Sequence, residues 1–127
     1  MNRIEEAKDF INKYNRIFDT GNMEEFSKLF CEPFISVRAD GSIANMPTNK
    51  IACEFFNTVY KTWQDEGYDT FTTKDFEVIE IGNNSMLVTF TWEMLDKNQK
   101  LIRQWRQSYN LLKNEGSWKV VTSTFHA

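Results

Sequence analysis

The second half of the chain alternates between apolar and polar residues in four long runs, and this pattern constrains the fold more than any other feature. Short turn sequences rich in Gly, Asn and Asp separate the runs, which occupy residues 68–81, 85–95, 101–113 and 118–125. A period of two is typical of β-strands, and turns this short join antiparallel neighbours. The pattern therefore predicts a meander of four long strands.

The start of the chain has the three- and four-residue spacing of amphipathic helices. The apolar face of the first predicted helix consists of Ile4, Ala7, Ile11, Tyr14 and Phe18. Gly21 should end this helix, because glycine adopts the left-handed conformation without steric strain. Asn22 and Glu25 then have the spacing of a capping box for a short second helix, which Pro33 should end.

A short strand over residues 34–38, an "ADGS" turn at 39–42 and a third helix follow. This helix begins at Pro47 and Thr48 and closes in "DEG" at 65–67. Helices followed by a meander of long strands predict an α+β fold, in which the helices pack on one face of a bent antiparallel sheet. The chain lacks linkers and repeats, so we expect a single domain over residues 1–127.

Large side chains occur on both faces of the predicted strands. In the strand over residues 85–95, one face carries Met86, Val88, Phe90, Trp92 and Met94, and the other carries Thr89, Thr91 and Glu93. The next alternates Arg103, Trp105, Gln107 and Tyr109 with Gln104, Arg106, Ser108 and Asn110. Alternation alone does not identify the face that meets the helices, because a β-bulge would exchange the two. Apolar patches on both faces predict a homodimer with Trp105 at its interface.

The order of elements and several short motifs resemble the nuclear transport factor 2-like superfamily. "YNRIFDTGNMEEFSKLF" followed by "DGS" is similar to its opening helices and first hairpin, and "GSWKVVTSTFH" to its last strand. The resemblance implies a cone-shaped fold with the helices on the concave face of the sheet, an apolar pocket between them and frequent dimerisation. The superfamily includes ketosteroid isomerases, polyketide cyclases and dehydratases, so the fold does not specify one function.

Ketosteroid isomerases carry a catalytic tyrosine on the first helix, seven residues before a glycine, and Tyr14 and Gly21 match that spacing. The aspartate that serves as base in that family corresponds to Arg38, which cannot accept a proton. The second donor, an aspartate, falls near residues 108–110, none of which is an acid. Because two of the three catalytic positions differ, the resemblance does not imply steroid isomerase activity.

Tyr14 is the one candidate catalytic residue, and two interpretations of it remain open. Its hydroxyl either bonds a backbone carbonyl in the core or donates into the pocket. The other candidate pocket residues are Phe18, Trp63, Trp92, Arg106, Ser108 and His126. Each of these also has a structural interpretation: the aromatic residues as core, Arg106 as a solvated strand residue and His126 as an exposed terminal residue.

Composition excludes several classes of function. The net charge of −3 argues against a nucleic-acid-binding face, and no apolar run approaches the ~20 residues of a membrane span. Residues 1–9 lack the apolar segment of a signal peptide, and Cys31 and Cys53 are expected to be free thiols, so we expect a cytoplasmic protein. One histidine and two separated cysteines exclude the usual zinc sites, and no phosphate-binding loop is present, so no metal or cofactor is expected.

The sequence therefore predicts a protein that binds a small hydrophobic molecule in a conical pocket. An isomerase, cyclase or lyase acting on a carbonyl compound is one form of this hypothesis, and the sequence does not decide whether the protein is an enzyme. The alternative is a non-catalytic dimerisation or assembly module, whose pocket its own Phe and Trp side chains would close.

Overall fold

The computed structural model describes residues 2–126, so the outermost residues of the predicted domain, 1 and 127, lie outside it. Helix α1 (Arg3–Asp19) begins at Asn2, whose side chain accepts the Glu5 N–H. It buries Ala7, Ile11, Tyr14 and Phe18 of the predicted face, whereas Ile4 near its start is 51% exposed. The chain leaves this helix at Gly21 with a φ of +78°, the left-handed conformation expected there. A side chain at this position would also lie against Tyr60.

The second helix is shorter than predicted. Helix α2 (Met23–Ser27) is capped by Asn22 as expected, but strand β1 (Phe30–Val37) begins before Pro33. The prediction that Pro33 ends a helix is therefore wrong. This proline lies between Phe30 and Ile35, where the pairing of β1 shifts register, and a residue without an N–H is tolerated at such an irregularity.

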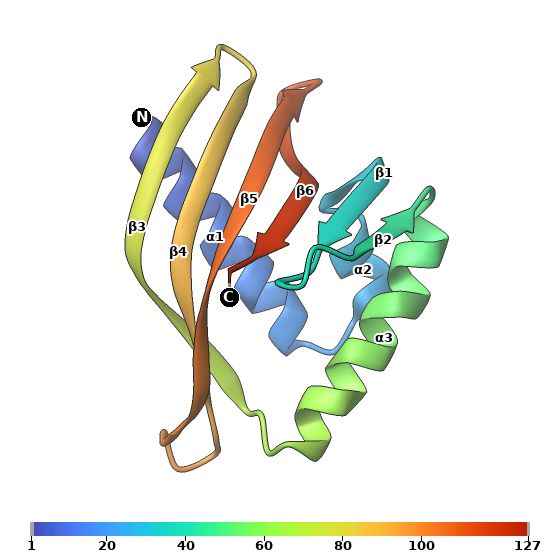
Figure 1. Ribbon diagram of the computed structural model, residues 1–127, viewed down its shortest axis with the longest axis vertical. Coiled ribbons are helices and arrows are strands. Elements are labelled where there is room, and N and C mark those ends of the chain that lie inside the picture. The colour runs from blue at the N-terminus through green and yellow to red at the C-terminus, as the bar shows by residue number, and fades with distance from the viewer. Residues whose placement is uncertain (1, 127) are drawn as a thin grey trace.

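Six strands form one sheet in the order β2-β1-β6-β5-β4-β3 (Figure 1). Helix α3 (Asn49–Asp65) intervenes between β2 and β3, and Thr48 caps it by accepting the Ile51 N–H. The remaining strands are β2 (Ile43–Met46), β3 (Thr70–Gly82), β4 (Ser85–Leu95), β5 (Leu101–Asn114) and β6 (Ser117–Phe125). The α+β architecture is confirmed. The sheet is mixed rather than antiparallel, because β1 pairs in parallel with β6.

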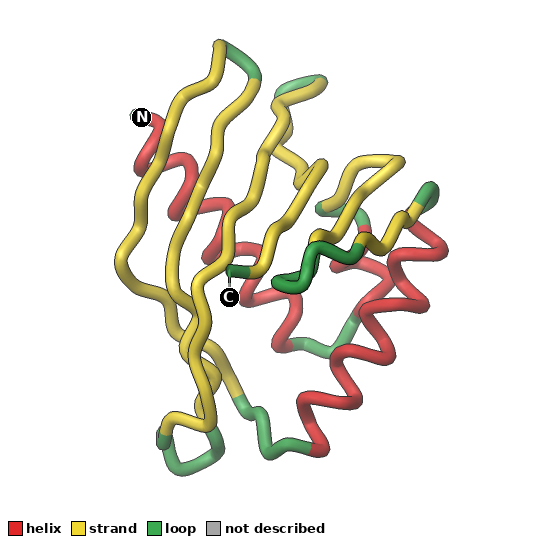
Figure 2. Tube along the Cα trace, in the orientation of Figure 1, coloured by secondary structure: helices red, strands yellow, loops and turns green. Residues whose placement is uncertain are grey.

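The buried face of β4 identifies the side of the sheet that meets the helices. Met86, Val88, Phe90, Trp92 and Met94 are all buried, and α1 crosses the sheet behind β3 to β5 (Figures 1 and 2). On β5, Trp105 pairs with Trp92 and Tyr109 with Val88, so these residues share the same face. The prediction that Trp105 lies at a dimer interface is thus not supported by its position, since its ring lies 5.6 Å from that of Trp63.

A polar tether fixes the end of α1 to the start of β3. The carboxylate of Asp19 accepts hydrogen bonds from the hydroxyls of Tyr68 and Thr70, the latter at 2.9 Å. Partial burial raises the pKa of Asp19, and the two hydrogen bonds offset part of that rise. The tether holds the aromatic face of α1 against the sheet.

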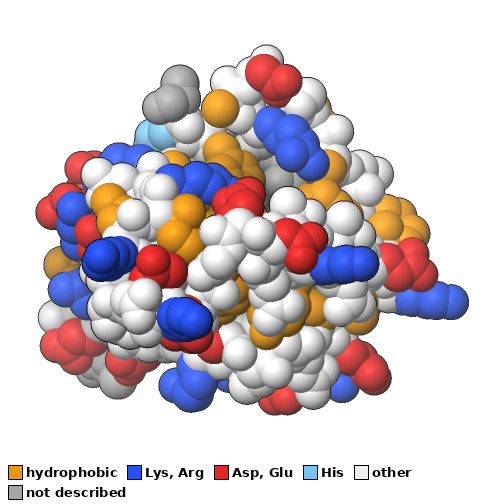
Figure 3. All heavy atoms as spheres, turned by 90° about the horizontal axis from the view of Figure 1, so that it is seen from below, with side chains coloured by type: hydrophobic (Ala, Val, Ile, Leu, Met, Phe, Trp, Pro, Cys, Tyr) orange, Lys and Arg blue, Asp and Glu red, His pale blue; other side chains and the backbone are white. Residues whose placement is uncertain are grey.

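Three further observations concern the helices, the charged surface and the thiols. No helix within residues 2–126 is long and apolar enough to cross a membrane. Basic and acidic side chains intermingle on the face seen in Figure 3. Cys31 and Cys53 are both free thiols.

Candidate functional site

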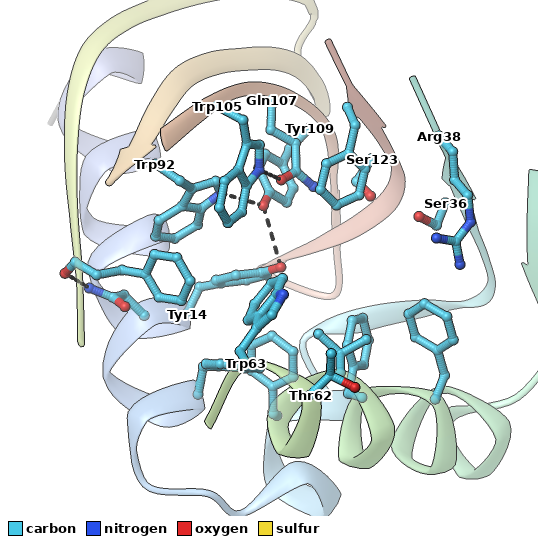
Figure 4. A pocket seen from close by; sticks show the side chains of 18 of the residues that line it. Tyr14, Ser36, Arg38, Thr62, Trp63, Trp92, Trp105, Gln107, Tyr109 and Ser123 are labelled. Atoms are coloured by element: carbon cyan, nitrogen blue, oxygen red, sulfur yellow. Dashed lines mark hydrogen bonds between the residues drawn. The ribbon is translucent and has the colours of Figure 1, made fainter. Parts of the chain in front are cut away.

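An open cavity of about 460 Å³ lies between the helices and the buried face of the sheet (Figure 4). Its helical wall is mainly aromatic. The aromatic residues are Tyr14, Phe18, Phe26, Phe55, Phe56 and Trp63, and the others are Asn15, Thr58, Val59 and Thr62. The facing wall comes from the strands and consists of Phe34, Phe71, Trp92, Trp105 and Phe125. Aromatic walls on both sides of such a cavity suit a flat apolar ligand.

Three hydrogen-bond donors meet at two oxygen atoms where α1 approaches β5. The indole Nε1 of Trp92 donates to the Tyr109 hydroxyl at 2.8 Å, and the hydroxyl oxygens of Tyr14 and Tyr109 lie 3.5 Å apart (Figure 4). The indole and the two phenols supply three hydrogens, whereas only the two phenolic oxygens accept. Whichever phenol donates in the bond between them, one phenolic hydrogen has no acceptor within this cluster.

Burial keeps both phenols in their neutral, donating form. Removal from water raises the pKa of Tyr14 and of Tyr109 well above the usual range. The ring of Tyr14 packs edge-on against Phe26, with 4.7 Å between ring centroids, while the residue also lines the cavity. The ring of Tyr14 thus belongs to the core, while its hydroxyl lies beside the Tyr109 hydroxyl rather than at a backbone carbonyl.

Two serines extend this polar group across the sheet. Ser123 pairs with Tyr109 on one side and with Ser36 on the other, so the three hydroxyls form a row over β5, β6 and β1. Both serines line the cavity and are only 4% exposed, and neither hydroxyl has a partner among the described residues. The one fully enclosed polar side-chain atom without a partner in residues 2–126 is Asn15 Oδ1, so the serine hydroxyls remain open to the cavity.

The remaining polar groups lie beside this row and at the rim. The side-chain oxygen of Gln107 accepts the indole N–H of Trp105 at 2.9 Å, which leaves its amide N–H groups free to donate. Arg103 pairs with Glu66 at 3.2 Å. Arg38 is exposed, lines the cavity and has no carboxylate within ion-pair distance in the described part of the chain.

The chemistry of the lining is that of a donor-rich binding site. Of the described residues that line the cavity, none is Asp, Glu, His or Cys. Residues 2–126 also contain no group of three or more side chains that could hold a metal ion. The arrangement can therefore bind an acceptor oxygen and polarise it, but offers no carboxylate or imidazole to remove a proton.

The structure brings together four of the seven predicted site residues. The cavity is lined by Tyr14, Phe18, Trp63 and Trp92. Arg106 and Ser108 lie on the outer face, because they alternate with the residues of β5 that face the helices. Arg106 pairs there with Glu77 at 2.9 Å, and the ring of His126 lies 2.8 Å from the Ser108 hydroxyl. These three residues do not contribute to the cavity.

The sequence-based prediction missed Ser36, Arg38, Gln107 and Ser123 as cavity residues. The signal for Gln107 was present, since it shares its face of the strand with Trp105 and Tyr109. No local pattern indicates the pairing of Ser36 with Ser123, because it depends on two strands far apart in the sequence. Tyr109 falls in the segment that corresponds to the second donor of ketosteroid isomerases.

Residues 5–127 match the family described as NTF2-like protein (DUF6841), and the chain belongs to that family. This confirms the resemblance to the nuclear transport factor 2-like superfamily. No curated protein sequence matches the chain.

Solved structures share the fold at low sequence identity. Aln2 from a Streptomyces species is 10% identical, with a TM-score of 0.79 over 97% of this chain and 89% of that one. A candidate scytalone dehydratase from Novosphingobium aromaticivorans is 12% identical, with a TM-score of 0.74 over 96% and 81%. A candidate calcium/calmodulin-dependent protein kinase II association domain from Xanthomonas campestris is 15% identical, with a TM-score of 0.75 over 100% and 89%.

Proposed function

We propose that this protein binds a small, flat aromatic molecule that carries an acceptor oxygen. The observation that carries the proposal is the phenolic hydrogen left without an acceptor in the cluster of Tyr14, Tyr109 and Trp92. A buried donor without a partner costs about 1–3 kcal/mol, and a ligand oxygen would recover that energy. Aromatic walls would hold the ring of the same ligand.

The described lining favours binding over proton-transfer catalysis. An isomerase, cyclase or lyase site needs a donor that polarises the substrate carbonyl, and a tyrosine can be that donor. It also needs a base to remove a proton, and the cavity lining offers no carboxylate or imidazole among the described residues. A reaction at this site would have to use a basic group of the ligand or a water molecule. A candidate scytalone dehydratase shares the fold. For this reason, lyase chemistry is the reaction we propose if the protein is an enzyme.

The open cavity argues against the alternative of an assembly module with a closed pocket. Such a module would fill the space with its own side chains, whereas about 460 Å³ remains open here. This volume is within the range of about 300–1,000 Å³ that is usual for small-molecule sites.

Replacing Tyr14 by phenylalanine tests the proposed function. Tyr14 is 9% exposed and Tyr109 only 1%, so the Tyr14 hydroxyl is the more accessible donor. The variant keeps the ring and the Trp92–Tyr109 hydrogen bond. Affinity for 2-acetylnaphthalene, measured by calorimetry, should fall at least about tenfold, or ~1.4 kcal/mol.

The matched ligand 2-ethylnaphthalene has the same ring system without the oxygen and serves as the control. Its affinity should be the same for both proteins. Failure of both ligands to bind the wild type would refute the proposed function. An unchanged affinity for the ketone, together with a lower melting temperature of the variant, would assign the Tyr14 hydroxyl to the core alone.

A homodimer is also part of the proposal, with the outer face of the sheet as its interface. Because Trp105 faces the helices, the outer face of the sheet is the face left for an interface. It carries Ile79, which pairs with Leu87 and is 56% exposed, and Ile81, which is 60% exposed. Sedimentation velocity at micromolar concentration should give about twice the monomer mass of 15.1 kDa, and a monomer would contradict this prediction.

A further inference from the structure

The hydroxyls of Ser36 and Ser123 make no hydrogen bond to the phenol cluster, which consists of Tyr14, Tyr109 and Trp92. Neither serine hydroxyl has a hydrogen-bond partner among the described residues. Ser36 and Ser123 are 4% exposed, lie opposite each other on adjacent strands and open into the cavity. Both hydroxyls are open to the cavity, so a ligand atom placed between them would give each a hydrogen-bond partner. Each can donate one hydrogen, which suits an acceptor with two oxygens.

A positive charge lies beside these hydroxyls. Arg38 is two residues beyond Ser36 along the same strand direction, so it projects to the same side of the sheet. Figure 4 shows its guanidinium group extending from the end of β1 toward α3, and its Cζ lies 6.0 Å from the centre of the Phe55 ring. No carboxylate of the described residues lies within ion-pair distance of it, whereas Glu66 pairs with Arg103, the other arginine at the rim. Asp40 in the following turn is a more distant neighbour, whose pKa is lowered first by hydrogen bonds to Ser42 and to a smaller extent by the charge of Arg38.

We infer that the ligand is an oxygenated aromatic carboxylic acid whose carboxylate lies at Ser36, Ser123 and Arg38. This inference rests on the proposed function and specifies the ligand class. A carboxylate offers two coplanar oxygens, which match a guanidinium fork and neighbouring hydroxyl donors. Arg38 is the one cation of the described cavity lining without an ion pair, and it can balance one negative charge. A phosphate would bring up to two charges into a chain whose own net charge is −3.

The two polar groups lie at a distance that a two-ring aromatic compound can bridge. Strands β5 and β1 flank β6, so the backbones at Tyr109 and Ser36 are separated by two strand spacings, roughly 10 Å, with Ser123 between them. A ligand oxygen at the phenols and a carboxylate at the Ser36 and Arg38 end of this row would therefore occupy opposite ends of one ligand. The aromatic side chains that line the cavity would cover its rings.

Calorimetry with two probes of the same shape tests this inference. The probes are 6-hydroxy-2-naphthoic acid and 6-hydroxy-2-naphthamide, which differ in charge at one end. The wild type should bind the acid at least about tenfold more tightly than the amide. Arg38→Gln should abolish this preference by weakening acid binding at least about tenfold more than amide binding.

Arg106→Gln is the matched control, because it removes the same charge from the outer face of the sheet. It should retain the preference for the acid. Ser123→Ala provides a second test that keeps the charge of Arg38, and it should lower acid affinity about three- to tenfold. Melting temperatures of all variants establish that each is folded.

The outcomes separate the ligand class from the binding function. Equal affinities of the wild type for acid and amide, both insensitive to Arg38→Gln, would overturn the carboxylate inference and leave the binding site intact. An equal loss in Arg38→Gln and Arg106→Gln would also overturn it, because the effect would then be one of net charge. If neither naphthalene probe nor 2-acetylnaphthalene binds, the proposed function fails and the inference fails with it.

Discussion

Replacing Val59 by tryptophan is expected to lower the affinity for 2-acetylnaphthalene at least about 100-fold, or ~2.7 kcal/mol, while the chain stays folded. Val59 projects from α3 and lines the cavity opposite the sheet. An indole at this position would occupy the space that the proposal assigns to the ligand. Since that space is open, the larger side chain should enter it without displacing the core, and calorimetry measures the loss of binding directly.

Asn57→Trp is the matched control for this prediction. Asn57 lies on the same helix, is exposed and does not line the cavity, so the variant adds the same ring outside the site. Its affinity for the ketone should equal that of the wild type. Ligand binding that survives Val59→Trp would show that the ligand binds elsewhere.

Truncation of Phe90 to alanine should lower the free energy of unfolding by about 3–5 kcal/mol, as for other large residues in a core. Phe90 is fully buried and lies between the rings of Phe76 and Tyr109, stacked on both, and it also contacts Trp92 edge-on. The loss is a large part of the about 5–15 kcal/mol that stabilises a typical domain. Urea unfolding measures it.

Ile4→Ala supplies the comparison at an exposed position, on α1 and away from the proposed dimer interface. Ile4 is 51% exposed, and its truncation should change the free energy of unfolding by no more than about 0.5 kcal/mol. A comparable loss in the two variants would mean that the apolar core is not centred on the face of β4 described above.

The local pattern of the sequence predicts most of the elements, because helices and hairpins form between near neighbours. Gly21 ends α1 as expected, and Thr48 caps α3. The four long strands begin and end within two residues of the predicted limits. Pro33 misled the prediction, since a proline ends a helix and also fits an irregular strand, and the choice depends on whether β6 pairs with that segment.

The site was less predictable than the fold, because it depends on pairing between distant strands. Tyr14 and Trp92 could be proposed from their own elements. The choice between the two faces of β5 follows only from its register with β4, which brings Trp105 opposite Trp92 and places Arg106 outside. Likewise, Ser36 and Ser123 look like ordinary strand residues until the parallel pairing brings their hydroxyls together.

The proposed ligand is an aromatic molecule whose oxygen accepts a hydrogen bond from the phenols of Tyr14 and Tyr109. A crystal structure of the protein with 2-acetylnaphthalene would locate this ligand. We expect the rings between Trp63 and Trp92 and the carbonyl oxygen within about 2.6–3.2 Å of the Tyr14 hydroxyl. Ligand density outside the cavity, or a carbonyl oxygen directed away from both Tyr14 and Tyr109, would contradict this proposal.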